Sequence, residues 1–204
     1  MYKGLSEKWR MIRRLPYVSI FLVVLNVIMF LISEADGGYL QSVGLLTVDG
    51  VLERREYGRL VLAMFLHGGI EHLFNNMLIL YFMGKMIEES IGHLPYVIIY
   101  FLAGLGGNIA SLWYKVKTYT LAGSLGASGA VFGLDGLLLA MVLFYKKPVE
   151  AVTPRRILLM ILLSLYSGFR RSNVDNAAHL GGLFIGLLAG GIYFLLIRRD
   201  RDIS

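Results

Sequence analysis

The chain has 204 residues, of which 56% are hydrophobic and 17% are charged, and its mean hydropathy is +0.65. A soluble domain of this length usually has about 45–50% apolar and about 25% charged residues, so the composition excludes an ordinary soluble protein. The formal net charge is +6, and cysteine is absent, which excludes disulfides and a thiol nucleophile. The apolar residues are concentrated in long runs, each near the roughly 20 residues that cross a bilayer, which indicates a polytopic membrane protein.

Six apolar runs predict an all-α fold, a helical membrane bundle with six transmembrane spans. The fifth run is short and would have to thin the bilayer or lean on its neighbours. Most connections between the runs are short, which favours a compact bundle. The six runs cover residues 17–33, 61–83, 94–114, 124–145, 156–169 and 177–197.

The basic residues predict the orientation of the bundle. An even number of spans places both ends of the chain on one side, where 13 of the 20 Lys and Arg residues would lie. The positive-inside rule then makes residues 1–16 and 198–204 cytoplasmic, flanking a core over 17–197. Topology therefore explains the positive charge without nucleic-acid binding. Because no small-x-small cleavage site follows the first run, we interpret it as a retained span and not as a signal peptide.

Residues 34–60 form the longest external connection. They combine the polar stretch "EADGG" with apolar residues between positions 45 and 52 that would not suit a free polar linker. We expect this loop to be ordered and to lie partly on the membrane surface.

Four polar side chains on three predicted spans fall at one depth. Ser128 lies near the start of the fourth span and His179 near the start of the sixth, while His72 and Asn76 lie in the outer part of the second. At about 1.5 Å of rise per residue, all four belong to the outer leaflet. Polar groups are costly in a bilayer, so we expect them to face the bundle interior or a water-filled cavity.

The chemistry of these side chains is complementary. A serine is a poor nucleophile until a base takes its proton, and histidine titrates near neutral pH. His72 and Asn76 are four residues apart on one helix face and can both donate to a developing oxyanion. Ser128 begins a helix after glycines, where backbone N–H groups are unpaired. The pattern predicts peptide-bond hydrolysis by a dyad of Ser128 and His179, which needs no metal and no cofactor.

Glycines indicate how residues on two helices could meet. Ala178, Gly182, Gly186 and Gly190 recur every four residues beside His179, and the fourth span has Gly129 and Gly133 at the same spacing. Small residues at this spacing let helix backbones approach closely in lipid. Close approach is what a serine and a histidine on separate helices need in order to share a hydrogen bond.

Other interpretations stay open. Glycine stripes often serve packing alone. His67 and His72 are five residues apart, about 140° around a helix, which suits joint metal ligation poorly. The runs hold only Asp135 as a deep carboxylate, which excludes an aspartyl mechanism because that mechanism needs two paired carboxylates. We favour a structural role for Asp135. Asp175 and Asn176 are predicted helix N-caps.

Three stretches resemble the signatures of the rhomboid intramembrane serine proteases, in the family's order and on its second, fourth and sixth spans. The resemblance covers roughly residues 17–197. The stretches are "HGGIEHLFNNM" at 67–77, "GASGAVFG" at 126–133 and "NVDNAAHLGGLFIG" at 173–186.

The resemblance implies a role for each matching position. Ser128 would be the nucleophile and His179 the general base. The oxyanion would be bound by His72, Asn76 and the backbone N–H of Ser128, with the N–H of Ala127 as a further donor. Supporting positions would be Gly126 and Gly129 at the turn, Phe132 stacked on the histidine, His67 near the water path, Gly182 and Gly186 in helix packing, and Arg59 in the first loop, where Gly58 stands in place of the family's tryptophan.

The function implied is endopeptidase cleavage of transmembrane protein substrates near their extracytoplasmic end, in the cell membrane. The substrate would enter laterally between the second and fifth spans, and the loop "RRSNVDN" would move. Two alternatives from other classes are a non-catalytic membrane-protein binder or chaperone on the same fold, and a small transporter. The transporter is disfavoured by the lack of inverted-repeat signs and of paired mid-membrane charges.

Overall fold

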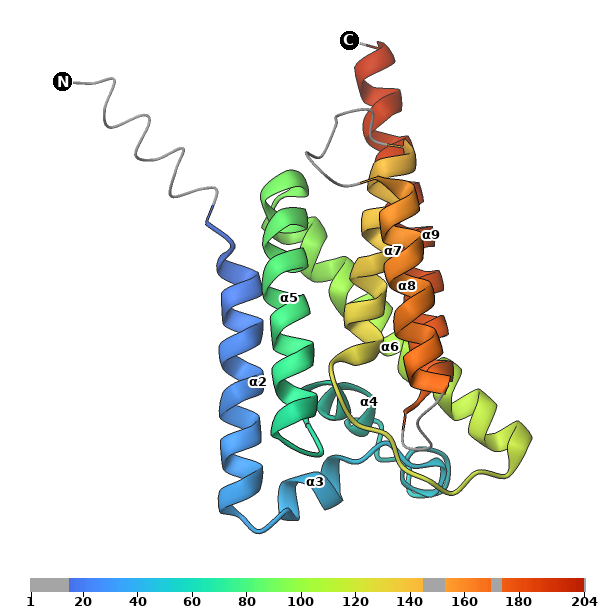
Figure 1. The fold of residues 1–204 in the computed structure, drawn as a ribbon. Coiled ribbons are helices and arrows are strands. Elements are labelled where there is room, and N and C mark those ends of the chain that lie inside the picture. Colours follow the sequence, from blue (N-terminus) through green and yellow to red (C-terminus); the bar gives the residue numbers. More distant parts are fainter. Residues whose placement is uncertain (1–14, 145–152, 170–173, 204) are drawn as a thin grey trace, which may run out of the picture.

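The computed structural model describes residues 15–144, 153–169 and 174–203, and these residues fold as a bundle of helices (Figure 1). The predicted all-α class is confirmed. In the described ranges the extended pairing is limited to an isolated antiparallel bridge between Leu46 and Ser124. The long helices are α2 (Tyr17–Ala35), α5 (Ile70–Ile91), α6 (His93–Thr118), α7 (Ser128–Phe144), α8 (Pro154–Phe169) and α9 (Asn176–Ile203).

The long helices alternate in direction along the chain, and α2 begins at the same end of the bundle at which α9 ends (Figure 1). Among the described residues, α2, α6 and the segment Asn176–Leu196 of α9 are long and apolar enough to cross a membrane, and α7 is a shorter apolar helix. The sixfold span count stays a prediction. Most of the basic segment 1–16 and residues 170–173 of the predicted moving loop lie outside the described residues.

The second predicted run is interrupted. Its first part forms α4 (Arg59–Leu62) and the 3-10 turn η2 (Ala63–Phe65), and the chain then becomes extended at Leu66 before α5 begins at Ile70. Gly69 precedes α5 in a fully extended conformation. This break turns His67 out of the helix that carries His72, so the two histidines do not share one helix.

The connection between α2 and α4 is folded and packed on the bundle, while its external location and its contact with the membrane stay predictions. It contains α3 (Tyr39–Gly44) and a π-helical turn, η1 (Asp49–Glu53). Leu46 and Val51 are buried in a small cluster with Ala63 and Leu112. These contacts fasten the connection to α6 at the lower end of the bundle in Figure 1.

Helix α9 packs most extensively on α7 and then on α6. A Cβ at Gly182 would lie 1.9 Å from the carbonyl oxygen of Gly129, and one at Gly186 would lie 1.9 Å from that of Gly133. Both separations are far inside van der Waals contact, so the two backbones touch directly. The four-residue spacing of the glycines places each contact one turn after the last.

We expect Gly186→Ala to destabilise the bundle. Its methyl group would overlap the carbonyl group of Gly133, and such overpacking typically costs about 1–3 kcal/mol of unfolding free energy even though alanine favours helix. Thermal unfolding of the purified protein in detergent measures this loss. The matched control is Gly191→Ala on the same helix, where the nearest atom, in the Phe144 ring, lies 3.6 Å away. Equal unfolding midpoints for the two variants would contradict the packing described here.

Candidate active site

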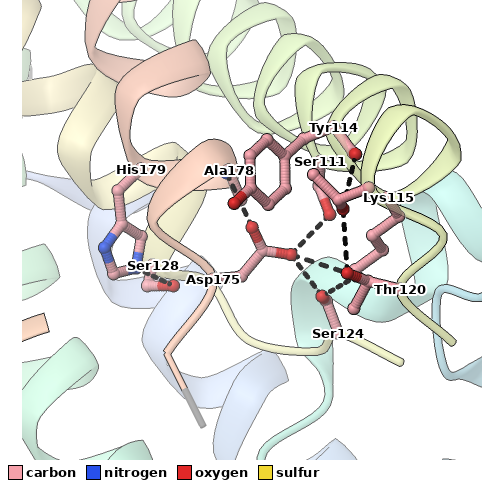
Figure 2. Close-up of polar contacts among 10 residues, drawn as sticks. Ser111, Tyr114, Lys115, Thr120, Ser124, Ser128, Asp175, Ala178 and His179 are labelled. Atoms are coloured by element: carbon pink, nitrogen blue, oxygen red, sulfur yellow. Dashed lines mark hydrogen bonds and ion pairs between the residues drawn. The ribbon is translucent and has the colours of Figure 1, made fainter. Parts of the chain in front are cut away.

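Helices α7 and α9 bring Ser128 and His179 together (Figure 2). The Nε2 atom of His179 lies 2.9 Å from the Oγ atom of Ser128, within hydrogen-bond range. His179 is 7% exposed, whereas Ser128 is only half-buried. The pair therefore combines a shielded imidazole with a hydroxyl that a substrate can approach.

The turn before α7 needs glycine at Gly126. Its φ is +130°, a backbone conformation that residues with a side chain rarely adopt, and a Cβ there would lie 2.7 Å from Cε1 of His72. The N–H of Gly126 donates to the carbonyl of Ala63, 2.9 Å away, and this hydrogen bond fixes the turn to η2. Ala127 then caps the helix, since its carbonyl accepts the N–H of Val131. Ser128 is thus the first helical residue, where N–H groups have no intrahelical acceptor.

The imidazole of His179 is oriented by stacking. The rings of Phe132 and His179 lie 4.2 Å apart between centroids with an interplanar angle of 13°. Because Nε2 faces a hydroxyl that must donate to it, the ring proton is assigned to Nδ1. That Nδ1 atom has no hydrogen-bond partner among the described residues.

The predicted oxyanion residues lie beside this turn. A Cβ added at Gly126 would lie 2.8 Å from Nε2 of His72 and 3.7 Å from Nδ2 of Asn76, so both side chains face this turn. Asn76 is also held by His67, whose Nε2 atom is 3.1 Å from the Asn76 amide nitrogen. An amide has two N–H donors, so one can satisfy His67 while the other stays available.

Arg59 anchors the first loop. It is 8% exposed and donates through Nη1 to the carbonyl oxygens of Ser42 (3.1 Å) and Leu45 (2.8 Å). Its Nε atom pairs with Glu56 at 2.6 Å. Gly58, the position where the resemblance leads one to expect tryptophan, has open space around its Cα. The arginine therefore holds the loop through backbone carbonyls without an aromatic neighbour at that position.

Asp175 is the centre of a polar cluster that sequence analysis missed (Figure 2). Ser111 and Ser124 each donate a short hydrogen bond to its Oδ2 atom, and the Nζ atom of Lys115 lies 3.1 Å from the same oxygen. Its Oδ1 atom accepts the N–H of Ala178 at 2.9 Å. Burial alone would raise the pKa of Asp175, but the two hydroxyls, Lys115 and the backbone N–H outweigh it and lower the pKa to about 2.

Two predictions concern the start of α9 and the buried carboxyl group of α7. Asp175 caps α9 as expected, but Asn176 is the first helical residue and does not cap it. Asp135 is 4% exposed, and its Oδ1 atom has no hydrogen-bond partner within the described ranges. In the same part of the chain no group of three His, Asp or Glu side chains could hold a metal ion.

These residues together can perform one kind of chemistry. A hydroxyl paired with an imidazole can attack a carbonyl group, and helix N–H groups beside an amide and a second imidazole can bind the oxyanion that forms. The hydroxyl and the free N–H groups begin α7, the amide and the second imidazole belong to α5, and the imidazole paired with the hydroxyl belongs to α9.

Comparison with known proteins shows the family of the chain. Residues 54–196 match the model of the Rhomboid domain. The chain is 33% identical over 178 residues to "Rhomboid protease GluP" of Bacillus subtilis (strain 168), which covers 85% of this chain and 34% of that protein. It is 38% identical over 164 residues to "RHOMBOID-like protein 4" of Arabidopsis thaliana, covering 78% of this chain and 39% of that protein.

A third relative is similar in length. "Putative rhomboid protease YdcA" of Bacillus subtilis (strain 168) is 31% identical over 144 residues, which covers 71% of this chain and 69% of that protein. The chain thus spans only about a third of the length of GluP and two fifths of that of RHOMBOID-like protein 4. With its apolar helices and its match to the domain model over most of its length, the chain is an integral membrane protein of the rhomboid family.

Proposed function

We propose that this protein is an intramembrane serine endopeptidase that cleaves transmembrane helices near their extracytoplasmic ends. The observation that carries the proposal is the 2.9 Å separation of Ser128 Oγ and His179 Nε2 in a member of the rhomboid family. Burial of His179 and its stacking on Phe132 support the assignment, because a general base must keep one orientation throughout the reaction.

In the acylation step, Ser128 Oγ attacks the carbonyl carbon of the scissile peptide bond while Nε2 of His179 takes the hydroxyl proton. The carbonyl oxygen becomes an oxyanion held by the N–H of Ser128 and the side chains of His72 and Asn76. The N–H of Ala127 lies next along the chain as a further donor. The C–N bond then breaks, and the imidazolium gives its proton to the departing amine. Each well-placed oxyanion donor is typically worth about 2.7–4 kcal/mol of barrier.

In the deacylation step, water attacks the ester that joins the substrate to Ser128. His179 takes a proton from this water, the same oxyanion donors act again, and the proton finally returns to Ser128 as the carboxylic acid product leaves. These steps are complete without a metal or a cofactor. Protons pass only among Ser128, His179, water and the departing amine of the substrate.

The substrate is proposed to be a transmembrane helix because the dyad lies within the bundle. Its peptide bonds are shielded by helical hydrogen bonds, so residues that weaken a helix near the cleavage point should favour cleavage. Lateral entry between α5 and α8 is the proposed route. Six spans with both ends on one side are supported by the alternation of the long helices and by α2 beginning where α9 ends (Figure 1). The distribution of basic residues supports the cytoplasm as that side.

We expect Ser128→Ala and His179→Ala each to abolish cleavage of a single-span substrate by the purified protein in detergent. Both variants should stay folded. Ser128→Ala should keep the wild-type unfolding midpoint, whereas His179→Ala should lower it, because it removes a buried ring that stacks on Phe132. Labelling by a fluorophosphonate should modify Ser128 in the wild type and fail in His179→Ala. Normal cleavage by Ser128→Ala would refute the proposal, and a folded wild type that neither cleaves nor reacts would favour a non-catalytic binder.

Asn76→Ala should slow cleavage by about 10²–10³-fold in kcat, the usual result of losing an oxyanion donor. Substrate binding should change little, since the oxyanion exists only in the transition state. Steady-state kinetics that resolve kcat from KM provide the measurement. A variant that raises KM and leaves kcat intact would place Asn76 in substrate binding instead.

A further inference from the structure

We propose that Asp175 is a positioning residue that holds the nucleophile and the base in register by bridging the two segments that carry them. The inference rests on the proposed function. It also makes a claim about structure that can be measured without any cleavage.

The bridge starts at the first turn of α9. Asp175 caps this helix through Oδ1, which accepts the N–H of Ala178 at 2.9 Å. Its own carbonyl accepts the N–H of His179 at 3.2 Å. One residue therefore sets the geometry of the turn on which the candidate base stands.

The other carboxylate oxygen reaches the segment that leads to the nucleophile. Oδ2 accepts the hydroxyl of Ser124, four residues before Ser128 (Figure 2). The main chain of Ser124 is fixed from its other side, since its N–H and C=O groups both pair with Leu46 at 3.0 and 2.9 Å. The carboxylate thus joins a restrained segment to a restrained helix start.

The cluster is built for a charged carboxylate. Ser111 and Lys115 of α6 both approach Oδ2, and Lys115 also donates to the Ser124 hydroxyl. The side chains of Lys115 and Asp175 are 6% and 19% exposed. Hydrogen bonds to an ionised carboxylate are stronger than those between neutral groups, and removal of the carboxylate would leave the buried charge of Lys115 uncompensated.

The ionised bridge predicts a specific dependence of stability on pH. The folded-state pKa of Asp175 is lowered to about 2, so its contribution is present above the unfolded-state pKa of about 4 and is lost as pH falls from about 4 to 2. Thermal unfolding midpoints should show this acid loss in the wild type, and Asp175→Asn should lack that component. An identical acid dependence in both proteins would overturn the ionised bridge.

Two substitutions separate the bridge from the helix cap. Asparagine caps helices as well as aspartate does, so Asp175→Asn keeps the cap and loses the charged bridge, whereas Asp175→Ala loses both. If the bridge positions the dyad, Asp175→Asn should already lower kcat by about 10- to 100-fold, with KM within about twofold of wild type. Fluorophosphonate labelling of Ser128 should slow by a similar factor. Near-normal kcat and labelling in Asp175→Asn, with only Asp175→Ala impaired, would reduce the residue to a cap and overturn the proposal.

Lys115→Met tests whether the cluster acts as a unit. Combined with Asp175→Asn, it removes the second charge that the first substitution leaves buried and unpaired. The double variant should be no slower than Asp175→Asn alone, since residues of one network do not contribute independently. Losses in kcat that multiply would contradict a shared bridge. The matched control is Asp36→Asn, an exposed carboxylate of the first loop that also accepts two backbone N–H groups and should leave kcat unchanged.

Hydrogen exchange of the full chain in detergent distinguishes failure of the bridge from failure of the proposed function. Asp175→Asn should speed amide exchange by about tenfold or more in residues 120–127 and in the first turn of α9, while Ser128→Ala should not, because it breaks no part of the bridge. A wild type that neither cleaves nor reacts would refute the protease assignment alone. Unchanged exchange in Asp175→Asn would refute the bridge, whatever the activity of the wild type.

Discussion

The direct contact between the backbones of α7 and α9 is the constraint on which the candidate site depends. Gly182 lies against the carbonyl of Gly129, and the same contact recurs one turn further along both helices. Lipid tails solvate apolar side chains as well as protein does, so close van der Waals packing is the main attraction available between such helices. This packing also sets the distance between Ser128 and His179, because Ser128 immediately precedes Gly129 and His179 lies three residues before Gly182. If the two helices moved apart, the hydrogen bond between the Ser128 hydroxyl and the His179 imidazole would lengthen.

Periodic features of the sequence predicted much of this arrangement. A helix repeats every 3.6 residues, and a membrane requires apolar side chains. The all-α class, the apolar helices and the glycine stripes can therefore be predicted from short stretches of sequence. Helix ends are different. The run 61–83 is broken around Gly69, and the run 124–145 becomes helical only at Ser128, because a bridge from Leu46 holds the preceding residues extended. Hydropathy averaged along a run is insensitive to both effects.

The bridge at Asp175 could not be predicted, because no sequence pattern relates its three segments, which are far apart along the chain. Ser111 and Lys115 lie in the last part of α6, and Ser124 lies in a loop, 51 residues before the carboxylate that it contacts. Only the cap was visible, since an aspartate before an apolar helix is a local signal. Tertiary packing alone determines that three donors from two segments meet on one oxygen.

The position of that carboxylate also explains how the imidazole of His179 can be oriented without a third member of a triad. A carboxylate on Nδ1 would bring a charge to the depth of the dyad, where desolvation is expensive. The ring plane is instead set by stacking on Phe132, and the charge is placed one helical turn earlier, where Lys115 neutralises it. Asp175 can therefore hold the start of α9 without touching the imidazole. Within the described residues, Nε2 of His179 is hydrogen-bonded to Ser128 and Nδ1 has no hydrogen-bond partner. In the proposed mechanism, orientation of the ring and proton transfer therefore depend on different groups, and each can be disturbed separately.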